Sequence, residues 1–342
     1  MDTRNFRALI VEESGDGIFS RSIKKRSIDD LPPGDVLIRV SYSSLNYKDA
    51  LSATGNRSIT KIYPHTPGID AAGIVEESSV SAFRPGNAVI VTGYDLGMNT
   101  PGGFGEYIRV PAYWAIRLPD GLSLRQSMIF GTAGLAATLS LRAIQAGGVT
   151  PGRGKILVTG ATGGVGSLAV LVLSESGYSV TAATGKTDKH GFLRMLGAEE
   201  IIHRDSVLAP PERMLLESAW TGVVDTVGGK FLDSALRSTA YGGVVTSCGM
   251  VASPKLETNV FPFILRGVRL QGIDSAQCPM GERRDIWNWL AETAIPEKLE
   301  QLAVECSLEE LDSHIEKMLK GGMSARVVVR VGDEKDEDRQ QY

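Results

Sequence analysis

The sequence places a run of glycines, Val158-Thr-Gly-Ala-Thr-Gly-Gly-Val-Gly166, between a predicted strand and a predicted helix. Gly160 and Gly163 allow a tight turn that brings backbone N–H groups close to a ligand, and Gly166 allows the helix to pack closely on the sheet. The helix that follows offers free N–H groups and the positive end of its dipole, which suit a diphosphate. The motif therefore predicts a dinucleotide site; the alternative is a glycine-rich turn that serves only packing.

The end of the next predicted strand bears on which dinucleotide is bound. Sites for NAD usually carry an acidic residue about 20 residues after the glycines, where it holds the ribose 2′-hydroxyl. This chain has Thr184-Gly185-Lys186 instead, and Arg204 follows the third strand. A hydroxyl, a backbone N–H and two cations attract a 2′-phosphate, whereas a carboxylate repels it. We therefore expect NADPH rather than NADH; the alternative is that Lys186 and Arg204 are ordinary solvated charges.

Asn46 and Tyr47 are the second group with possible chemistry, in the loop after a strand expected at residues 37–42. The amide of Asn46 and the hydroxyl of Tyr47 can each donate a hydrogen bond to an oxygen that gains negative charge in a reaction. We expect both residues at the nicotinamide and substrate face, and we expect Asp49 to cap a helix. The alternative for Tyr47 is a packed aromatic ring with an exposed tip.

The elements that must position these residues divide the chain into three stretches. The middle stretch alternates strand-like and helix-like runs, which predicts an open parallel sheet with helices on both faces and right-handed crossovers. Its expected strands are residues 155–160, 179–184, 200–203, 222–226, 243–248 and 269–272. Helices are expected at 165–176 and 188–196, each ended by a glycine. Pro210–Pro211 makes a helix in the third crossover less certain.

The two flanking stretches consist of short β-branched runs separated by Gly and Pro, which is typical of a β-rich, barrel-like unit. We expect them to join into one domain around the inserted nucleotide domain. The predicted boundaries are residues 1–124 plus 267–342 for the catalytic domain and 125–266 for the NADPH-binding domain.

Composition excludes several classes of function. The formal net charge of -4 gives no basic footprint for nucleic acid. The three cysteines lie far apart and the four histidines have no ligand spacing, so no metal site and no disulfide framework is expected. We see no signal peptide and no run of about 18 apolar residues, so we expect a cytoplasmic protein without a membrane helix.

The chain resembles the medium-chain dehydrogenase/reductase superfamily over nearly its whole length. The resemblance rests on the Asn46 to Asp49 segment, on the glycine loop, and on further signatures at Pro67–Gly73, Phe83–Val89, Gly102–Tyr107 and Gly131–Gly134. It implies a Rossmann-type doubly wound parallel sheet inserted in a β-rich GroES-like catalytic domain. Zinc-containing members carry Cys near the Asn46 position and His at the Ile69 position, so the match is to the zinc-free, quinone oxidoreductase-like branch.

A closer resemblance is to the acrylyl-CoA reductase (NADPH) family, especially over Phe261–Ser275. It implies reduction of the C=C bond of a short 2-enoyl-CoA, most simply acryloyl-CoA to propanoyl-CoA, by hydride transfer to the β-carbon and protonation of the α-carbon. The family usually has Ser-Gly-Arg at the 2′-phosphate corner. Because Lys186 is a point charge where the family has a forked guanidinium, cofactor discrimination is expected to be softer here.

The resemblance also implies contacts to the cofactor. It places Thr162, Gly163, Gly164 and Val165 at the diphosphate and Thr184, Gly185, Lys186 and Arg204 at the 2′-phosphate. It places Met250, Ile264 and Ser275 at the nicotinamide, with Tyr47 beside them and Arg326 near the cleft. From pattern alone, Ile264 would be a core residue.

Other functions remain open at this point. One is an NADPH:quinone oxidoreductase, and another is a catalytically weak NADPH-binding protein with the same fold. A thioester substrate would need cations for the CoA phosphates, for which Arg57, Lys61, Arg266 and Arg269 are candidates. We expect a homodimer through the apolar segment 260–273, because an exposed strand edge is normally paired or blocked.

Overall fold

The computed structural model describes residues 4–210, 212–293 and 296–332, which divide into two compact units. Unit 1 runs to Thr132 and resumes at Ala276, and unit 2 holds Ala133–Ser275. The predicted boundaries after residues 124 and 266 lie earlier than these. The first division falls inside helix α2 (Leu124–Ala146), and the second follows strand β13 (Arg269–Gly272), which belongs to the sheet of unit 2.

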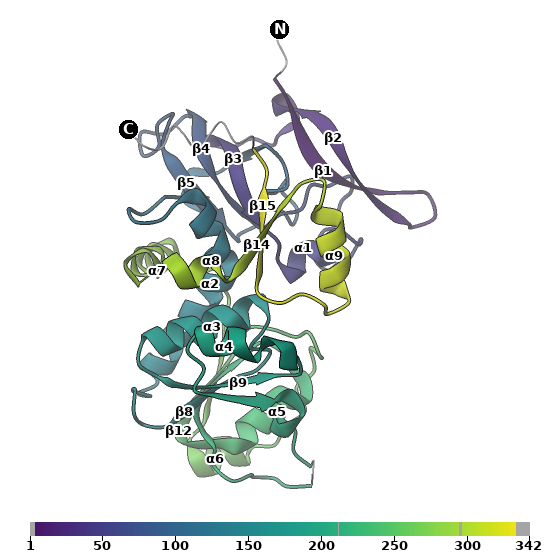
Figure 1. Cartoon of the computed structure of the whole chain (residues 1–342). Helices are drawn as coiled ribbons and strands as arrows, with labels where there is room; N and C mark the ends of the chain where they lie inside the picture. Colours follow the sequence, from purple (N-terminus) through teal and green to yellow (C-terminus); the bar gives the residue numbers. More distant parts are fainter. Residues whose placement is uncertain (1–3, 211, 294–295, 333–342) are drawn as a thin grey trace. The chain divides into compact units, whose positions relative to one another are not determined.

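Unit 2 is built on a parallel sheet whose described strands follow the order β10-β9-β8-β11-β12-β13. Strands β8, β9 and β12 of this sheet are labelled in Figure 1. The first five in chain order are β8 (Lys155–Val158), β9 (Ser179–Thr184), β10 (Glu200–His203), β11 (Trp220–Asp225) and β12 (Thr239–Ser247). This is the strand order of a doubly wound nucleotide-binding fold, as predicted. The order reverses between β8 and β11, and in such sheets ligands bind at the carboxyl ends of the strands beside that reversal.

Helices connect these strands and cover the sheet. They are α3 (Gly164–Glu175), α4 (His190–Met195), α5 (Gly229–Ser238) and α6 (Phe261–Arg266), with short 3-10 turns η3 (Thr187–Lys189) and η4 (Arg204–Val207). Helix α3 packs on β8 and β9, and α5 packs on β11 and β12. The described residues between β10 and β11 form η4 and no α-helix, which agrees with the uncertainty about that crossover.

Unit 1 is a β-rich unit in which both flanking stretches meet, as predicted. Its main sheet has the order β14-β15-β3-β4-β5-β7 with β6 paired to β3, and β1 and β2 form a separate antiparallel hairpin. C-terminal β15 pairs antiparallel with N-terminal β3, which joins the two ends of the chain. The strands are β1 (Asn5–Glu13), β2 (Phe19–Ser27), β3 (Val36–Ser44), β4 (Asp70–Ser78), β5 (Ala88–Thr92), β6 (Tyr107–Val110), β7 (Ala115–Arg117), β14 (Ala303–Ser307) and β15 (Arg326–Arg330).

The helices of unit 1 are short apart from α7. They are η1 (Ile28–Asp30), α1 (Tyr47–Ser52), η2 (Ala112–Trp114), α7 (Met280–Thr293), α8 (Pro296–Glu300) and α9 (Leu311–Leu319). Alternating strand residues such as Ile38, Val40 and Val329 fill one core with Phe104, all of them at most 1% exposed. Burial of this apolar surface is the main stabilising force of the unit.

Helix α2 is interrupted at Gly131, whose φ of +49° and ψ of -153° are accessible in practice only to glycine. A Cβ there would lie 2.5 Å from the Asp70 carboxylate, so the break also allows the helix to approach β4 closely. By length and composition α2 could cross a membrane, but 78% of its apolar window is buried inside the fold. It is therefore a core helix with an apolar surface on most sides.

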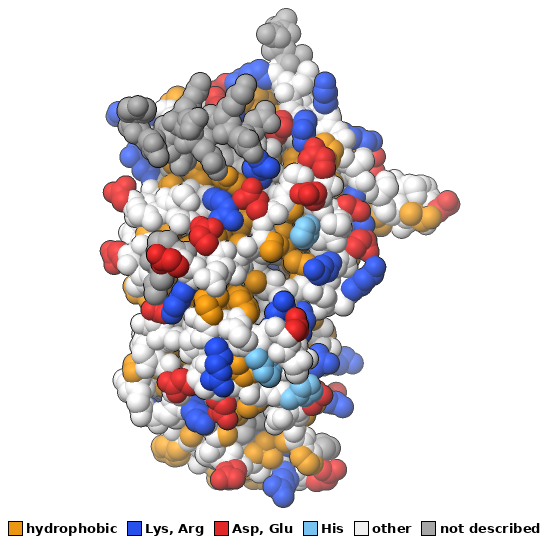
Figure 2. Space-filling model, in the orientation of Figure 1, with side chains coloured by type: hydrophobic (Ala, Val, Ile, Leu, Met, Phe, Trp, Pro, Cys, Tyr) orange, Lys and Arg blue, Asp and Glu red, His pale blue; other side chains and the backbone are white. Residues whose placement is uncertain are grey.

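Charged side chains of both signs are interspersed on the face of the molecule drawn in Figure 2. No single sign of charge dominates this face.

Candidate active site

The glycine loop connects β8 to α3 with the tight backbone that the motif predicts. Gly160 has a left-handed φ of +60°, and Gly163 is the N-cap residue of α3. A Cβ on Gly166 would lie 2.3 Å from the carbonyl oxygen of Gly160, so the bare glycine lets the first turn of α3 approach the loop closely while the helix packs on β8 and β9. The first N–H groups of α3 are therefore placed directly behind the loop, where an anion can reach them.

Asp225 joins the ends of β8 and β11 at the point where the strand order reverses. The side chain is fully buried, and its Oδ1 accepts a hydrogen bond from the Thr159 hydroxyl at 2.6 Å. Its Oδ2 accepts from the backbone N–H of Gly228 at 2.8 Å. Burial raises the pKa of Asp225, and the hydrogen bonds from Thr159 and Gly228 oppose that rise. This buried carboxyl group therefore links the residue after β8 to the turn before α5.

The predicted 2′-phosphate corner assembles at the ends of β9 and β10. The Thr184 hydroxyl lies 3.3 Å from the Thr162 hydroxyl of the glycine loop and accepts from the Lys186 backbone N–H at 3.1 Å. A Cβ on Gly185 would lie 3.2 Å from Nε of Arg204, so the guanidinium extends over the glycine. The structure thus brings a hydroxyl, a bare backbone and a guanidinium together, and Nε of Arg204 also lies 3.6 Å from Oδ1 of the neighbouring Asp205.

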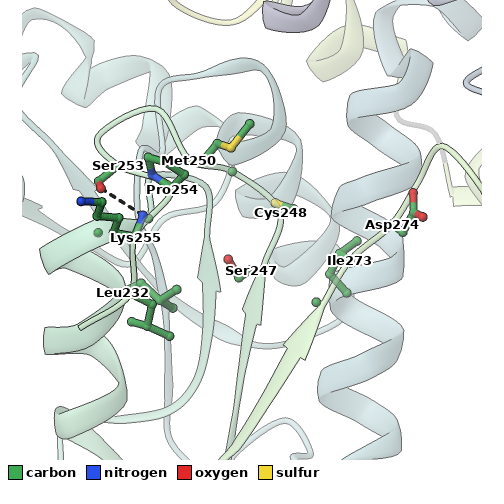
Figure 3. A pocket seen from close by; sticks show the side chains of 14 residues that line it. Leu232, Ser247, Cys248, Met250, Ser253, Pro254, Lys255, Ile273 and Asp274 are labelled. Carbon is green, nitrogen blue, oxygen red and sulfur yellow. Dashed lines mark hydrogen bonds between the residues drawn. The ribbon is translucent and has the colours of Figure 1, made fainter. Parts of the chain in front are cut away.

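A pocket of about 560 Å³ lies at the carboxyl ends of β11, β12 and β13 (Figure 3). Met250, one of the predicted nicotinamide contacts, lines this pocket with Cys248 and Ile273. Ser275 follows directly after the lining residue Asp274. Ile264 lies on α6, is 71% exposed and is not among the residues that line the pocket. The core position that pattern alone would give Ile264 is therefore wrong, because α6 turns this side chain outward, and its contact with the nicotinamide stays a prediction.

Asn46 and Tyr47 form the start of helix α1 in unit 1. Asn46 is the N-cap residue, and its backbone N–H donates to Oδ2 of Asp49 at 2.8 Å, which confirms the predicted capping role of Asp49. Oδ1 of Asp49 accepts from the backbone N–H of Ile69 at 2.8 Å. Tyr47, the first residue of the helix, is 39% exposed.

The Asn46 carboxamide is already engaged within unit 1. Its Nδ2 donates to Oδ2 of Asp70 at 2.8 Å and to the Ser44 carbonyl oxygen at 3.3 Å. Its Oδ1 accepts from Nη1 of Arg326 at 3.1 Å. An amide nitrogen has two hydrogens, and both have acceptors here. Asn46 therefore differs from the free donor that the sequence suggested.

Arg326, which we expected near the cofactor, is buried inside unit 1. Its side chain is 2% exposed, with Nε donating to the Ile129 carbonyl oxygen at 2.9 Å and Nη2 to the Ser44 hydroxyl at 2.8 Å. Burial lowers the pKa of this guanidinium, and the nearby Asp70 and Asp49 act in the opposite direction. The residue is enclosed by unit 1 and shares its partners with Asn46.

Two of the cations suggested for the CoA phosphates have other partners. Arg57 pairs with Glu13 and donates to the Lys61 carbonyl oxygen. Arg266 donates to the carbonyl oxygens of Leu216 at 2.6 Å and of Arg237 at 3.1 Å. Both guanidinium groups therefore stabilise local structure. Lys61 and Arg269 are the remaining candidates for contact with the CoA phosphates.

Comparison with known proteins bears on the family. A profile described as "Alcohol dehydrogenase GroES-like domain" matches residues 32–120, and one described as "Zinc-binding dehydrogenase" matches residues 164–292. Acrylyl-CoA reductase AcuI of Ruegeria pomeroyi is 41% identical over 95% of this chain and 99% of its own length. The chain belongs to the acrylyl-CoA reductase family of the medium-chain dehydrogenases/reductases. It is therefore an oxidoreductase with the GroES-like and Rossmann-type domains of that superfamily.

Solved structures share the same fold. The yhdH oxidoreductase of Salmonella enterica, crystallised in complex with NADP, is 41% identical and has a TM-score of 0.92, with 95% of this chain and 100% of that chain covered. YhfP of Bacillus subtilis, which carries a quinone oxidoreductase name, is 42% identical with 95% of this chain and 99% of its own length covered. Its crystal structure has NAD bound, with 96% of this chain and 100% of that chain covered and a TM-score of 0.92.

This acrylyl-CoA reductase family member has side chains that do not suit zinc at the ligand positions of its zinc-containing relatives. The Asn46 carboxamide is hydrogen-bonded to Asp70 and Arg326. Ile69 is 3% exposed, and its side chain has no atom that can bind a metal ion. Within the described ranges, no group of three or more His, Cys, Asp or Glu side chains could hold a metal ion.

Sequence reasoning did not single out Asp70, Ser44 or Thr132, which surround Asn46. Two signals pointed to them. Asp70 is an acid at the start of an apolar strand, where a buried charge needs a partner. Arg326 is a cation at the start of Arg326–Arg330, a strand otherwise rich in valine, and so offers that partner.

Asp49 makes stability depend on pH. Burial, with a smaller effect of nearby Asp70, raises the pKa of Asp49 from 3.8 to about 7. Between those values the folded protein holds a proton that the unfolded chain releases, so the free energy of unfolding falls as pH rises and levels off above about pH 7. The free energy of unfolding is measured with urea for the wild type and for Asp49→Asn at each pH. The difference between the two proteins should decline by up to about 1.4 kcal/mol per pH unit as the pH rises. Parallel stability curves across the range would contradict this assignment.

Proposed function

We propose that this protein is an NADPH-dependent reductase of the C=C bond of a short 2-enoyl-CoA, with acryloyl-CoA reduced to propanoyl-CoA. The observation that carries the proposal is the 41% identity with an acrylyl-CoA reductase over 95% of the chain. An activated alkene also suits a site whose side chains cannot hold a metal ion to polarise an alcohol or ketone.

The proposed NADPH site lies in unit 2. The N–H groups at the start of α3 and the residues from Thr162 to Val165 receive the diphosphate, while Thr184, Gly185, Lys186 and Arg204 receive the 2′-phosphate. The support is the arrangement of Arg204 over Gly185, since a guanidinium can form paired hydrogen bonds with a phosphate. When bound, NADPH supplies the hydride that adds to the β-carbon.

The chain's own residues orient the enoyl group and stabilise charge. As the hydride adds, negative charge builds on the thioester carbonyl oxygen and a proton then adds at the α-carbon. A hydrogen-bond donor aimed at that oxygen lowers the barrier. Tyr47 is the proposed donor, because the residue is 39% exposed while the Asn46 amide hydrogens have partners in unit 1.

A quinone is the second candidate substrate. It is favoured by the 42% identity with YhfP, whose name is that of a quinone oxidoreductase. The nicotinamide end of the site, proposed to include Met250 and Ser275, would serve either acceptor.

We also propose that the catalytic role belongs to unit 1, that the protein acts in the cytoplasm and that it is a homodimer. Strand β13 ends the sheet of unit 2, and all four of its residues are exposed. Val260, Ile264 and Leu265 beside it are 60%, 71% and 56% exposed. A strand edge flanked by exposed apolar side chains suits pairing with a second copy.

The substrate proposal is tested by the initial rate of NADPH oxidation with acryloyl-CoA, crotonyl-CoA and a simple benzoquinone. We expect the highest kcat/KM with acryloyl-CoA. A higher value with the quinone would support the second candidate. NADPH binding without turnover of any acceptor would instead indicate a binding protein.

The cofactor corner is tested by Gly185→Ala and Arg204→Ala. The new Cβ at residue 185 would meet Arg204, so both changes should raise KM for NADPH about tenfold and leave KM for NADH unchanged. Gly191→Ala is the matched control, because a Cβ there meets nothing within 4 Å. An equal rise with both cofactors would argue against a 2′-phosphate role.

The dimer is tested by sedimentation velocity at micromolar concentration. We expect a dimer for the wild type and a monomer for Ile264→Asp, because the carboxylate would be buried in the interface. Ile62→Asp is the control, since Ile62 is 77% exposed in unit 1. A monomeric wild type would remove the claim.

A further inference from the structure

The carboxylate of Asp70, at the start of β4, is fully buried and accepts hydrogen bonds from residues on β3, α2 and the loop between β3 and α1. Its Oδ2 accepts from the Ser44 hydroxyl at 2.6 Å and from Asn46 Nδ2 at 2.8 Å. Its Oδ1 accepts from the Thr132 hydroxyl at 2.6 Å. The backbone N–H of Thr132 lies 3.1 Å from Oδ1 and 3.0 Å from Oδ2.

Arg326 faces the same group from β15. Nη1 donates to Asn46 Oδ1 at 3.1 Å, Nη2 donates to the Ser44 hydroxyl at 2.8 Å, and Nη2 lies 3.9 Å from Asp70 Oδ2. Ser44 therefore bridges the two buried charges, because its hydroxyl accepts from the guanidinium and donates to the carboxylate.

We propose that Asp70 is a positioning residue that sets the orientation of the Asn46 carboxamide and, through it, of Tyr47. A carboxylate only accepts hydrogen bonds and a guanidinium only donates them. Asp70 must therefore face the nitrogen of Asn46, and Arg326 must face its oxygen. A turned carboxamide would place its oxygen against the carboxylate and its N–H groups against the guanidinium.

The orientation of the Asn46 carboxamide affects Tyr47 because the two residues are adjacent at the start of α1. Asn46 is the N-cap and Tyr47 is the first residue of the helix. The side chain of Asn46 is held by Asp70 and Arg326, while its backbone N–H is held by Asp49 at 2.8 Å. With both its side chain and its backbone held, Asn46 fixes the direction in which the first turn presents the Tyr47 ring. The inference rests on the proposed function only in taking Tyr47 to contact the substrate.

The test compares kcat and KM for the wild type, Asp70→Asn and Thr132→Val. Asp70→Asn places an NH2 group where donors now point, and we expect kcat to fall about 100-fold with KM for NADPH unchanged, since small misplacements of a reacting group cost that much. Thr132→Val removes one donor to Asp70 and keeps the side-chain shape, so a smaller loss of kcat is expected. This milder variant keeps the test valid if Asp70→Asn does not fold.

The matched control is Thr138→Val on the same helix, whose buried hydroxyl has no hydrogen-bond partner among the described residues. It should leave kcat unchanged. Each change is also made in an Asn46→Ala background. If Asp70 acts through Asn46, Thr132→Val and Asp70→Asn lower kcat little further in that background, whereas independent structural effects multiply.

Crystal structures of the two variants give a readout that does not depend on turnover. We expect the Asn46 carboxamide to be rotated or displaced in Asp70→Asn or, where that variant does not fold, in Thr132→Val. An unchanged Asn46 and Tyr47, or multiplicative losses of kcat, would overturn the inference. A wild type that turns over neither thioester nor quinone contradicts the proposed function, and the crystal structures then decide the inference alone.

Discussion

The polar interior of unit 1 is organised around the buried carboxylate of Asp70. Asp70 is fully buried, and a buried charge without partners is too costly for a folded domain to keep. Its partners come from β3, from α2 and from the loop before α1, and the guanidinium that balances its charge comes from β15. The need to satisfy this one group therefore ties together segments that lie far apart in the sequence.

That constraint also explains local features of the backbone. Helix α2 breaks at Gly131 where a side chain would collide with the Asp70 carboxylate and the Ser44 hydroxyl. The break turns the Thr132 N–H and hydroxyl toward the same carboxylate. Ala325, just before Arg326, has a φ of +63°, an uncommon value for a residue other than glycine. The chain thus accepts unusual conformations beside this network on two separate segments.

Unit 2 obeys a different constraint, which is the geometry of a parallel sheet. Because all strands run in one direction, their carboxyl ends meet at one edge, and the reversal of strand order leaves a crevice there. Asp225 holds the ends of β8 and β11 together there, and the hydroxyls of Thr162 and Thr184 bring the glycine loop close to the end of β9. The proposed cofactor site therefore uses short segments that follow β8, β9 and β10, each adjacent to its strand in sequence.

The sequence by itself determined most of unit 2. The strands from β8 to β13, helix α3 and the grouping of Thr184 with Arg204 follow from local patterns, because each βα unit is built from neighbouring residues. The sequence also predicted the capping role of Asp49, since a helix start is encoded within a few residues. The domain boundaries predicted from the sequence lie earlier in the chain than the divisions in the structure. The kink in α2 and the pairing of β13 cannot be recognised from composition.

Only the tertiary structure decided how unit 1 uses its polar residues. Asp70, Ser44, Thr132 and Arg326 are separated by as many as 282 positions. An acid and a cation at the starts of apolar strands each indicate the need for a partner, but the sequence does not specify which side chains meet. The structure also turned Ile264 outward and engaged the amide of Asn46. The physical reason is that hydrogen bonds of a buried charge are satisfied by whichever segments the fold brings within about 3 Å, and that choice depends on strand pairing across the whole chain.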